Sequence, residues 1–118
     1  MLNKLNRITK QREFDAFFGK EFKLKKGKNM AGRFMILKVF KNELKTPRFG
    51  FMLNTKVDKR AVVRNRIKRQ LRESIRLRLK EFKGSFDCLI VVKPTVKDIE
   101  AKELEKELFY LFKKANIL

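Results

Sequence analysis

The spacing of apolar residues changes along the chain, and the first segment has helical spacing. Phe14 and Phe18 stand four residues apart within residues 7–18, so they share one face of a helix. Thr9 is suited to cap the start of this helix and Gly19 to end it. The pattern predicts one short helix with its aromatic side chains on a single face.

Three strand-like segments follow. Residues 20–28 are rich in lysine around Phe22 and Leu24, which predicts a weak strand before a turn at Gly27. Residues 34–40 are rich in β-branched and aromatic side chains, and they predict a firmer strand.

The third strand, at residues 48–53, has two different faces. Because side chains alternate along a strand, Phe49, Phe51 and Leu53 point one way, towards a core. The opposite face is smaller and more polar, as the floor of an open groove would be, and it holds Arg48, Gly50, Met52 and Asn54. On this face a glycine leaves room for a ligand to approach the backbone closely.

The second half of the chain returns to helical spacing. Val63, Ile67, Leu71 and Ile75 recur every four residues and predict a helix over residues 60–80. A buried strand and a last helix complete the pattern, over residues 86–92 and from an N-cap at Asp98 onward. The order helix, three strands, helix, strand, helix predicts one α+β domain over residues 1–118, with a mixed sheet covered mainly on one face.

Composition and charge exclude several classes of function. The 32 Lys and Arg residues against 13 Asp and Glu residues leave a net charge of +19, which is costly unless a polyanion is the partner. The chain has no histidine, which excludes His-based triads and His metal sites. Its one cysteine, Cys88, lies in an apolar run and is expected to be a buried, unreactive thiol. No segment has the pattern of a membrane span or a signal peptide, so a cytoplasmic location is expected.

The basic charge is concentrated on the helix predicted over residues 60–80. Residues 59–80 contain ten basic side chains and a single acid, Glu73, whereas a merely solvated helix face interleaves more glutamate. Seven of the ten are arginine, whose planar fork suits phosphate. Opposite the apolar stripe the sequence places Asn65, Lys68, Arg69, Arg72 and Arg76. This face is expected to bind nucleic acid, whereas five acids within residues 98–107 make the last helix a poor candidate.

The kind of nucleic acid is harder to predict. No zinc-finger, basic-zipper or helix-turn-helix pattern is present, and a basic helix beside a groove fits irregular or single-stranded RNA better than DNA. Phe14 and Phe18 have two interpretations: they stack on unpaired bases, or they are core contacts between the first helix and the sheet. The pattern alone favours the core contact.

The basic helix also carries a motif that resembles the signature of the bacterial ribonuclease P protein subunit, namely Arg64–Asn65–Arg66–Ile67–Lys68–Arg69 followed by Leu71–Arg72–Glu73. Upstream, Arg48–Phe49–Gly50–Phe51 is similar to the Arg-x-Gly-apolar strand of that family, and Phe14 and Phe18 are similar to its first-helix aromatic pair. Length, charge and element order agree over essentially the whole chain.

This resemblance implies a fold and two sites. The fold would be an α–β sandwich of order α-β-β-β-α-β-α, with an unusual left-handed crossover through the basic helix. Residues implied to bind the RNA subunit are Arg60, Arg64, Asn65, Arg66, Lys68, Arg69, Arg72 and Arg76. Residues implied to bind the 5′ leader of precursor tRNA are Phe14, Phe18, Leu37, Arg48, Gly50, Met52, Asn54 and Lys56.

The chain departs from the family pattern after the third strand. Many relatives have two consecutive lysines there, whereas this chain has Asn54–Thr55–Lys56, so the first lysine is replaced by Thr55. The connection over residues 57–61 also lacks the glycine of many relatives.

The implied function is that of the protein subunit of ribonuclease P, which removes the 5′ leader of precursor tRNA by cleaving a phosphodiester. Mg²⁺ ions and the catalytic groups are expected on the RNA subunit, with one protein per RNA. A structural RNA-binding protein, such as a ribosomal component, is the alternative that composition permits. A nuclease acting alone would need clustered acids, whereas the acids here are scattered or gathered near the C-terminus.

Overall fold

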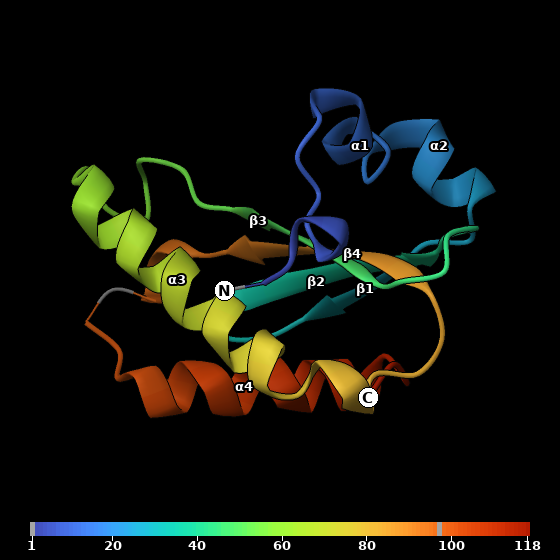
Figure 1. Ribbon diagram of the computed structural model, residues 1–118. Coiled ribbons are helices and arrows are strands. Elements are labelled where there is room, and N and C mark those ends of the chain that lie inside the picture. The colour runs from blue at the N-terminus through green and yellow to red at the C-terminus, as the bar shows by residue number, and fades with distance from the viewer. Residues whose placement is uncertain (1, 97) are drawn as a thin grey trace.

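A four-stranded mixed sheet forms the middle of the molecule in the computed structural model, which describes residues 2–96 and 98–118 (Figure 1). In space the strands follow the order β1-β2-β4-β3. Strand β2 is antiparallel to both of its neighbours, β1 and β4. Strands β3 and β4 are parallel and therefore need a long crossover, which a helix supplies. The strands are β1 (Lys28–Ala31), β2 (Met35–Lys41), β3 (Arg48–Met52) and β4 (Phe86–Val92).

Helices lie on both sides of the sheet. In Figure 1, α1 (Gln11–Asp15) and α2 (Gly19–Leu24) lie above it, and α4 (Ala101–Lys114) lies below it. The crossover helix α3 (Ala61–Leu77) packs beside α4. Within residues 2–96 and 98–118, three short 3-10 turns complete the fold, at Lys4–Asn6, Leu79–Glu81 and Pro94–Val96. None of the helices in the described part of the chain is long and apolar enough to cross a membrane.

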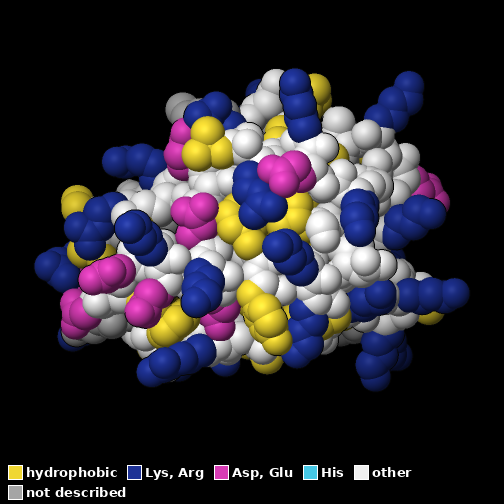
Figure 2. Space-filling view, turned by 90° about the horizontal axis from the view of Figure 1, so that it is seen from below, with side chains coloured by type: hydrophobic (Ala, Val, Ile, Leu, Met, Phe, Trp, Pro, Cys, Tyr) yellow, Lys and Arg dark blue, Asp and Glu magenta, His cyan; other side chains and the backbone are white. Residues whose placement is uncertain are grey.

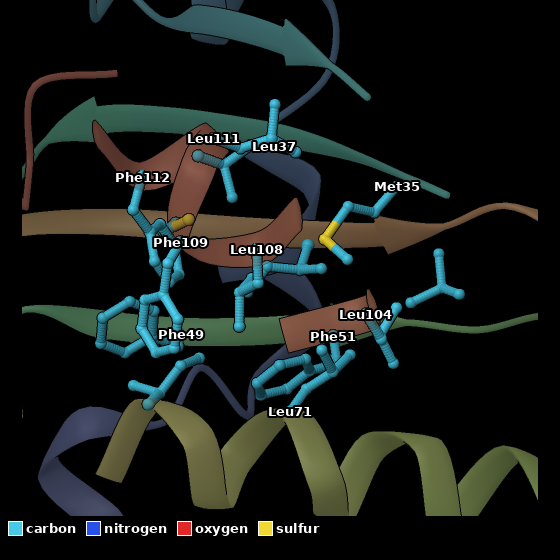
Figure 3. Close-up of a cluster of buried hydrophobic side chains, with 14 of the residues drawn as sticks. Met35, Leu37, Phe49, Phe51, Leu71, Leu104, Leu108, Phe109, Leu111 and Phe112 are labelled. Carbon is cyan, nitrogen blue, oxygen red and sulfur yellow. The ribbon is translucent and has the colours of Figure 1, made fainter. Parts of the chain in front are cut away.

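The larger core lies between the sheet, α3 and α4 (Figure 3). Phe49 and Phe51 point from β3 towards α3 and α4, as the alternation along that strand predicts. Leu71 and Leu108 meet them from the two helices, and both are almost fully buried. The predicted stripe on α3 is confirmed, because its buried residues are Ile67, Leu71 and Ile75. Burial of this stripe turns the opposite side of α3 towards solvent.

A second, smaller core lies on the opposite face of the sheet. Phe17 and Phe22 from the N-terminal segment pack on Phe40 of β2, with the rings of Phe17 and Phe40 4.8 Å apart between centroids. Leu89 of β4 completes this cluster. The sheet is therefore covered on both faces, more fully by α3 and α4 than by α1 and α2.

The elements after residue 34 are confirmed within a few positions. The strand predicted over residues 86–92 has the same bounds as β4, and the helix predicted over residues 60–80 is α3. Cys88 is fully buried, and burial raises the pKa of its thiol well above the usual value, as expected for an unreactive thiol. The mixed α+β class is confirmed, while the handedness of the crossover stays a prediction.

The N-terminal elements differ from the prediction. The first helix begins at Gln11 because Arg7 pairs with Phe49 of β3, and the N–H of Ile8 donates to the Phe49 carbonyl at 2.9 Å. Its N-cap is therefore Lys10, one residue beyond the predicted Thr9.

The weak strand predicted over residues 20–28 is wrong, because its first half is the helix α2 and β1 begins only at Lys28. A strand would place Phe22 and Leu24 on one buried face, yet Leu24 is 83% exposed and only Phe22 is buried. Gly19, predicted to end the first helix, has a φ of +70° and begins the second one. The last helix likewise has its N-cap at Glu100, two residues after the predicted Asp98.

Leu108→Ala tests the main core. The side chain is fully buried between α4 and the sheet, so its truncation leaves a cavity and should lower the free energy of unfolding by about 2–5 kcal/mol in urea titrations. Tyr110→Ala is the matched control on the same helix, because Tyr110 is 62% exposed and its loss should change stability by less than about 0.5 kcal/mol. Equal losses for the two variants would contradict this assignment of the core.

Candidate nucleic-acid interface

The start of α3 is held by hydrogen bonds of the Asp58 and Arg64 side chains. Asp58 Oδ1 accepts a hydrogen bond from the backbone N–H of Arg60, the residue that precedes the helix, at 2.9 Å. The Arg64 guanidinium reaches back and donates to the carbonyls of Asp58 and Lys59, at 2.7 and 3.0 Å. These bonds fix the orientation of the first turn and use part of the donor capacity of Arg60 and Arg64.

The exposed residues among those predicted on α3 fall into two groups, according to whether they form an ion pair. Arg60 and Arg76 are exposed and form ion pairs with Asp58 and Glu73. The Arg76–Glu73 pair is exposed on both sides and contributes little to stability, so a phosphate can replace the Glu73 carboxylate. The Asp58 carboxylate beside Arg60 is instead only 8% exposed. Asn65, Arg66 and Arg69 are exposed as well, and no described acid forms an ion pair with either arginine.

Two further cations of α3 lean towards the sheet. Lys68 and Arg72 are half-buried, and the Arg72 guanidinium lies 5.7 Å from the centroid of the Phe51 ring. The Nε atoms of Arg72 and of Arg7, in the N-terminal segment, are buried and have no hydrogen-bond acceptor within the described residues. Burying donors without partners is costly, so these two guanidinium groups are suited to accept an anion.

Burial and the charges of neighbouring cations both disfavour the charged forms of Lys68 and Arg72. Burial, and next the charge of Arg7, lowers the pKa of Arg72. Burial, followed by the charges of Arg72 and Arg64, lowers the pKa of Lys68. A bound phosphate would remove both the repulsion and the unsatisfied donors.

The same face has a hollow large enough for such a group. Its volume is about 310 Å³, and it is lined by Asn65, Lys68, Arg69, Arg72 and Glu73. Four of these five were predicted from the sequence to lie on the outward face of the helix. Arg7 was missed, because the sequence pattern assigned it to a helix rather than to the bridge with β3.

Above the sheet, the two predicted aromatic residues have different environments. Phe14 is half-buried over Gly50, where a Cβ atom would lie 3.0 Å from the Phe14 ring and 3.2 Å from Ile8 Cβ. Phe18 is 45% exposed, with the Lys38 ammonium 5.1 Å from its ring centroid. The core-contact interpretation therefore describes Phe14, whereas Phe18 is open to a ligand.

Two residues predicted to bind a leader strand are corrected by the structure. Leu37 is fully buried on the face of β2 that packs against α4, so it cannot line a groove on the other face. Gly50 is also buried, and the space above it is filled by Phe14 and Ile8 rather than left for a ligand. Lys38 was missed, because its strand was predicted only as a core element.

Arg48 lies on the predicted face of β3, but its guanidinium is already occupied. Its Nε and Nη2 donate to the two carboxylate oxygens of Asp87, at 2.9 and 2.6 Å, and Nη1 donates to Glu13. Asn42 donates a further bond to Asp87 at 2.8 Å. Arg48 therefore joins β3, β4 and α1, and this structure gives it a positional role instead of a free positive charge.

The remaining predicted residues lie at the end of β3. Met52 is half-buried and packs against the smaller core, while Asn54 and Lys56 are exposed in the following loop. Asn54 Oδ1 accepts the backbone N–H of Lys56 at 2.9 Å, which shapes this turn and leaves the lysine side chain in solvent.

The α4 face has a different electrostatic character. Figure 2 looks at the molecule from this side and shows acidic side chains next to basic ones. Glu107 of α4 accepts the backbone N–H groups of Arg33 and Phe34, so one of its acids has a structural role. A polyanion is therefore attracted to α3 and the upper face more than to α4.

Comparison with known proteins supports one family. The family model described as Ribonuclease P matches residues 2–116. The ribonuclease P protein component of Syntrophomonas wolfei subsp. wolfei is 37% identical, and the match covers 99% of this chain and 92% of that protein. The corresponding protein of Alkaliphilus oremlandii is 34% identical, over 97% of this chain and 94% of its own.

Solved structures agree with this match. The RNase P protein of Staphylococcus aureus has a TM-score of 0.81 at 26% identity, covering 95% of this chain and 96% of that chain. The protein from Thermotoga maritima has a TM-score of 0.77 at 21% identity, over 92% and 96%, which shows the shared fold.

Glu13→Gln tests the ion pairs around Arg48. Burial raises the pKa of Glu13, but hydrogen bonds from the Lys10 backbone and from Arg48 outweigh it, so the pKa is lowered from the usual 4.5. This stabilisation is present above pH 4.5 and is lost as the pH falls through the lower folded-state pKa. In urea titrations from about pH 6 to about pH 3, the wild type should exceed the variant in stability by an amount that shrinks in acid. Glu21→Gln, at an exposed glutamate of α2, is the control, and a pH-independent difference would contradict the assignment.

Proposed function

The chain belongs to the bacterial ribonuclease P protein family, and on that premise we propose that it binds the catalytic RNA subunit through α3 and the 5′ leader of precursor tRNA above the sheet. The protein component of this family works in an endoribonuclease holoenzyme. The single observation that carries the proposal is the cluster of Arg7, Lys68 and Arg72. These cations are half-buried, and no described acid is paired with them.

Binding of the RNA subunit is assigned to the outward face of α3. Arginine forks there can bind phosphates in pairs of hydrogen bonds, and each contact releases counterions from the RNA. Arg66 and Arg69 can bind phosphate without breaking an ion pair in the described structure. Arg60 and Arg76 must first exchange a carboxylate for a phosphate. The proposed set is Arg60, Arg64, Asn65, Arg66, Lys68, Arg69, Arg72 and Arg76, with Arg7 added from the structure.

Binding of the leader is assigned to the upper face between α1 and the end of β3. Phe18 offers an exposed ring on which an unpaired base can stack, and Lys38 beside it offers a charge for the adjacent phosphate. Met52, Asn54 and Lys56 extend this surface along β3 and the loop that follows. Phe14 and Arg48 support it from beneath, the first by packing and the second by holding α1.

The contribution of this chain to the reaction is then electrostatic. Mg²⁺ at the active site of the RNA subunit would supply the activated water and stabilise the leaving oxygen. The residues of this chain would lower the repulsion between RNA phosphates and add binding energy to a substrate that carries a leader. Because only the precursor fills the upper face, the precursor would bind more tightly than the mature product. One protein per RNA, in the cytoplasm, completes the proposal.

Reconstitution with a bacterial ribonuclease P RNA tests the proposed function. At low Mg²⁺ and moderate salt, cleavage of precursor tRNA should require both components. Arg66→Ala with Arg69→Ala should weaken protein–RNA binding about tenfold or more, because two phosphate contacts are lost. Lys102→Gln with Lys106→Gln on α4 removes the same charge from another face and is the control. Tight RNA binding without any stimulation of cleavage would favour the structural RNA-binding alternative.

Phe18→Ala separates leader binding from RNA-subunit binding. Loss of one stacking platform should weaken the affinity of the holoenzyme for precursor tRNA by about 1–3 kcal/mol and leave the affinity for mature tRNA unchanged. Tyr110→Ala, at an exposed aromatic residue on α4, should change neither affinity. Equal weakening of precursor and mature tRNA binding by Phe18→Ala would argue against a leader site at this position.

A further inference from the structure

A second hollow lies at one end of the sheet, and none of its lining residues belongs to α3 or β3. Its volume is about 470 Å³. The end of α2, the loop before β4 and the C-terminal residues line it together. We call it the lysine pocket, because five lysines line it: Lys25, Lys26, Lys28, Lys41 and Lys83.

The floor of the lysine pocket is apolar. Phe86 and Ile117 belong to the main core and are buried beneath it, whereas Leu24 is 83% exposed at its edge. The lining includes no aspartate and no glutamate. Basic side chains also crowd the right-hand end of the molecule in Figure 2. An apolar floor within a ring of cations fits a ligand that has an apolar ring system and a negative charge.

The walls of the pocket are built from turns that the fold holds in place. Lys26, Gly84 and Asn116 all have positive φ angles, of 56°, 76° and 62°. The first of these is the least favourable, because a lysine gains nothing from the left-handed conformation that a glycine adopts freely. The Lys83 N–H donates to the Ile117 carbonyl at 2.9 Å and ties the loop before β4 to the C-terminus. The pocket is therefore a formed feature of the fold.

A strip of cations over aromatic rings connects this pocket with Phe18. The Lys38 ammonium lies 5.1 Å from the Phe18 ring centroid and 5.0 Å from that of Phe22. Phe22 contacts Phe40 edge-on, and the Lys25 ammonium lies 5.0 Å from the Phe40 ring centroid. Because Lys25 also lines the pocket, a polyanion that passes Phe18 has cations along its path into the pocket.

We propose that the lysine pocket binds one nucleotide of single-stranded RNA, with the base against Leu24 and the phosphates on Lys25 and Lys83. The strand would be the continuation of the one that passes Phe18. The proposal rests on the proposed function in taking RNA as the partner and in placing a strand at Phe18. The cationic strip suits a partner of repeating negative charge, and RNA is favoured over an acidic peptide because the proposed function places a leader strand at Phe18.

Binding of a fluorescent oligouridylate to the free protein tests this inference. An oligomer of about 12 nucleotides is long enough for more than one contact. Lys25→Gln with Lys83→Gln should weaken binding about tenfold near physiological salt and lower the slope of log K against log salt by about 1.4, at about 0.7 per phosphate contact. Leu24→Asn should weaken binding about threefold without changing that slope, because it removes apolar contact and no charge.

Matched variants decide what each result means. Lys102→Gln with Lys106→Gln again removes two charges elsewhere, and losses equal to those of the pocket variant would overturn the proposal as a general charge effect. No effect of Leu24→Asn would overturn the placement of the base against Leu24 at the edge of the pocket. Every substituted side chain is exposed, so circular dichroism should confirm that all variants fold.

A competition experiment and a comparison of variants separate the proposal from its alternatives. A polyglutamate peptide of equal charge should compete poorly, whereas equal competition would overturn RNA in favour of an acidic protein partner. If Phe18→Ala and the Arg66→Ala, Arg69→Ala variant weaken oligouridylate binding while the pocket variants do not, the pocket proposal alone fails. If none of them weakens binding, the proposed function fails with it.

Discussion

The arrangement of the upper face depends on one buried carboxylate, Asp87. It is 3% exposed, and a charge buried to that extent is tolerated only when it is paired and hydrogen-bonded. Arg48 pairs with it from β3, and the remaining guanidinium nitrogen binds Glu13 of α1. These contacts tie α1 to the sheet, which places Phe14 over Gly50. Phe18, three residues beyond the end of α1, is then left facing solvent.

The cations behind the net charge of +19 differ in whether the fold pairs them with a carboxylate. Arg48 is neutralised by the fold, and Arg78 forms an ion pair with Glu81. Arg7, Lys68 and Arg72 are instead held close together, half-buried and without a carboxylate in the described structure. Such a cluster lowers the stability of the free protein and raises its affinity for a polyanion. An anion bound there would lower the repulsion between these cations.

Sequence-based prediction succeeded where regularly spaced apolar residues all lie on one face of an element and that face is buried. The stripe on α3, the alternation along β3 and the apolar run of β4 each specify their own packing side, because burial decides which face turns inward. It failed over residues 20–28, where Phe22 is the only buried side chain of α2 and carries no period. It also failed at Arg7, which is extended because it pairs with β3, forty-two residues away.

By itself, the sequence determined the mixed α+β class, the basic face of α3 and the family, since these follow from composition, periodicity and a local motif. The tertiary structure decided which predicted residues are accessible. Leu37 faces α4, Gly50 is covered by Phe14, and Arg48 is bound by two carboxylates. It also brought Arg7 to α3 and Lys25 to Lys83. The physical reason is that exposure and charge pairing depend on contacts between residues distant in sequence, which no local pattern encodes.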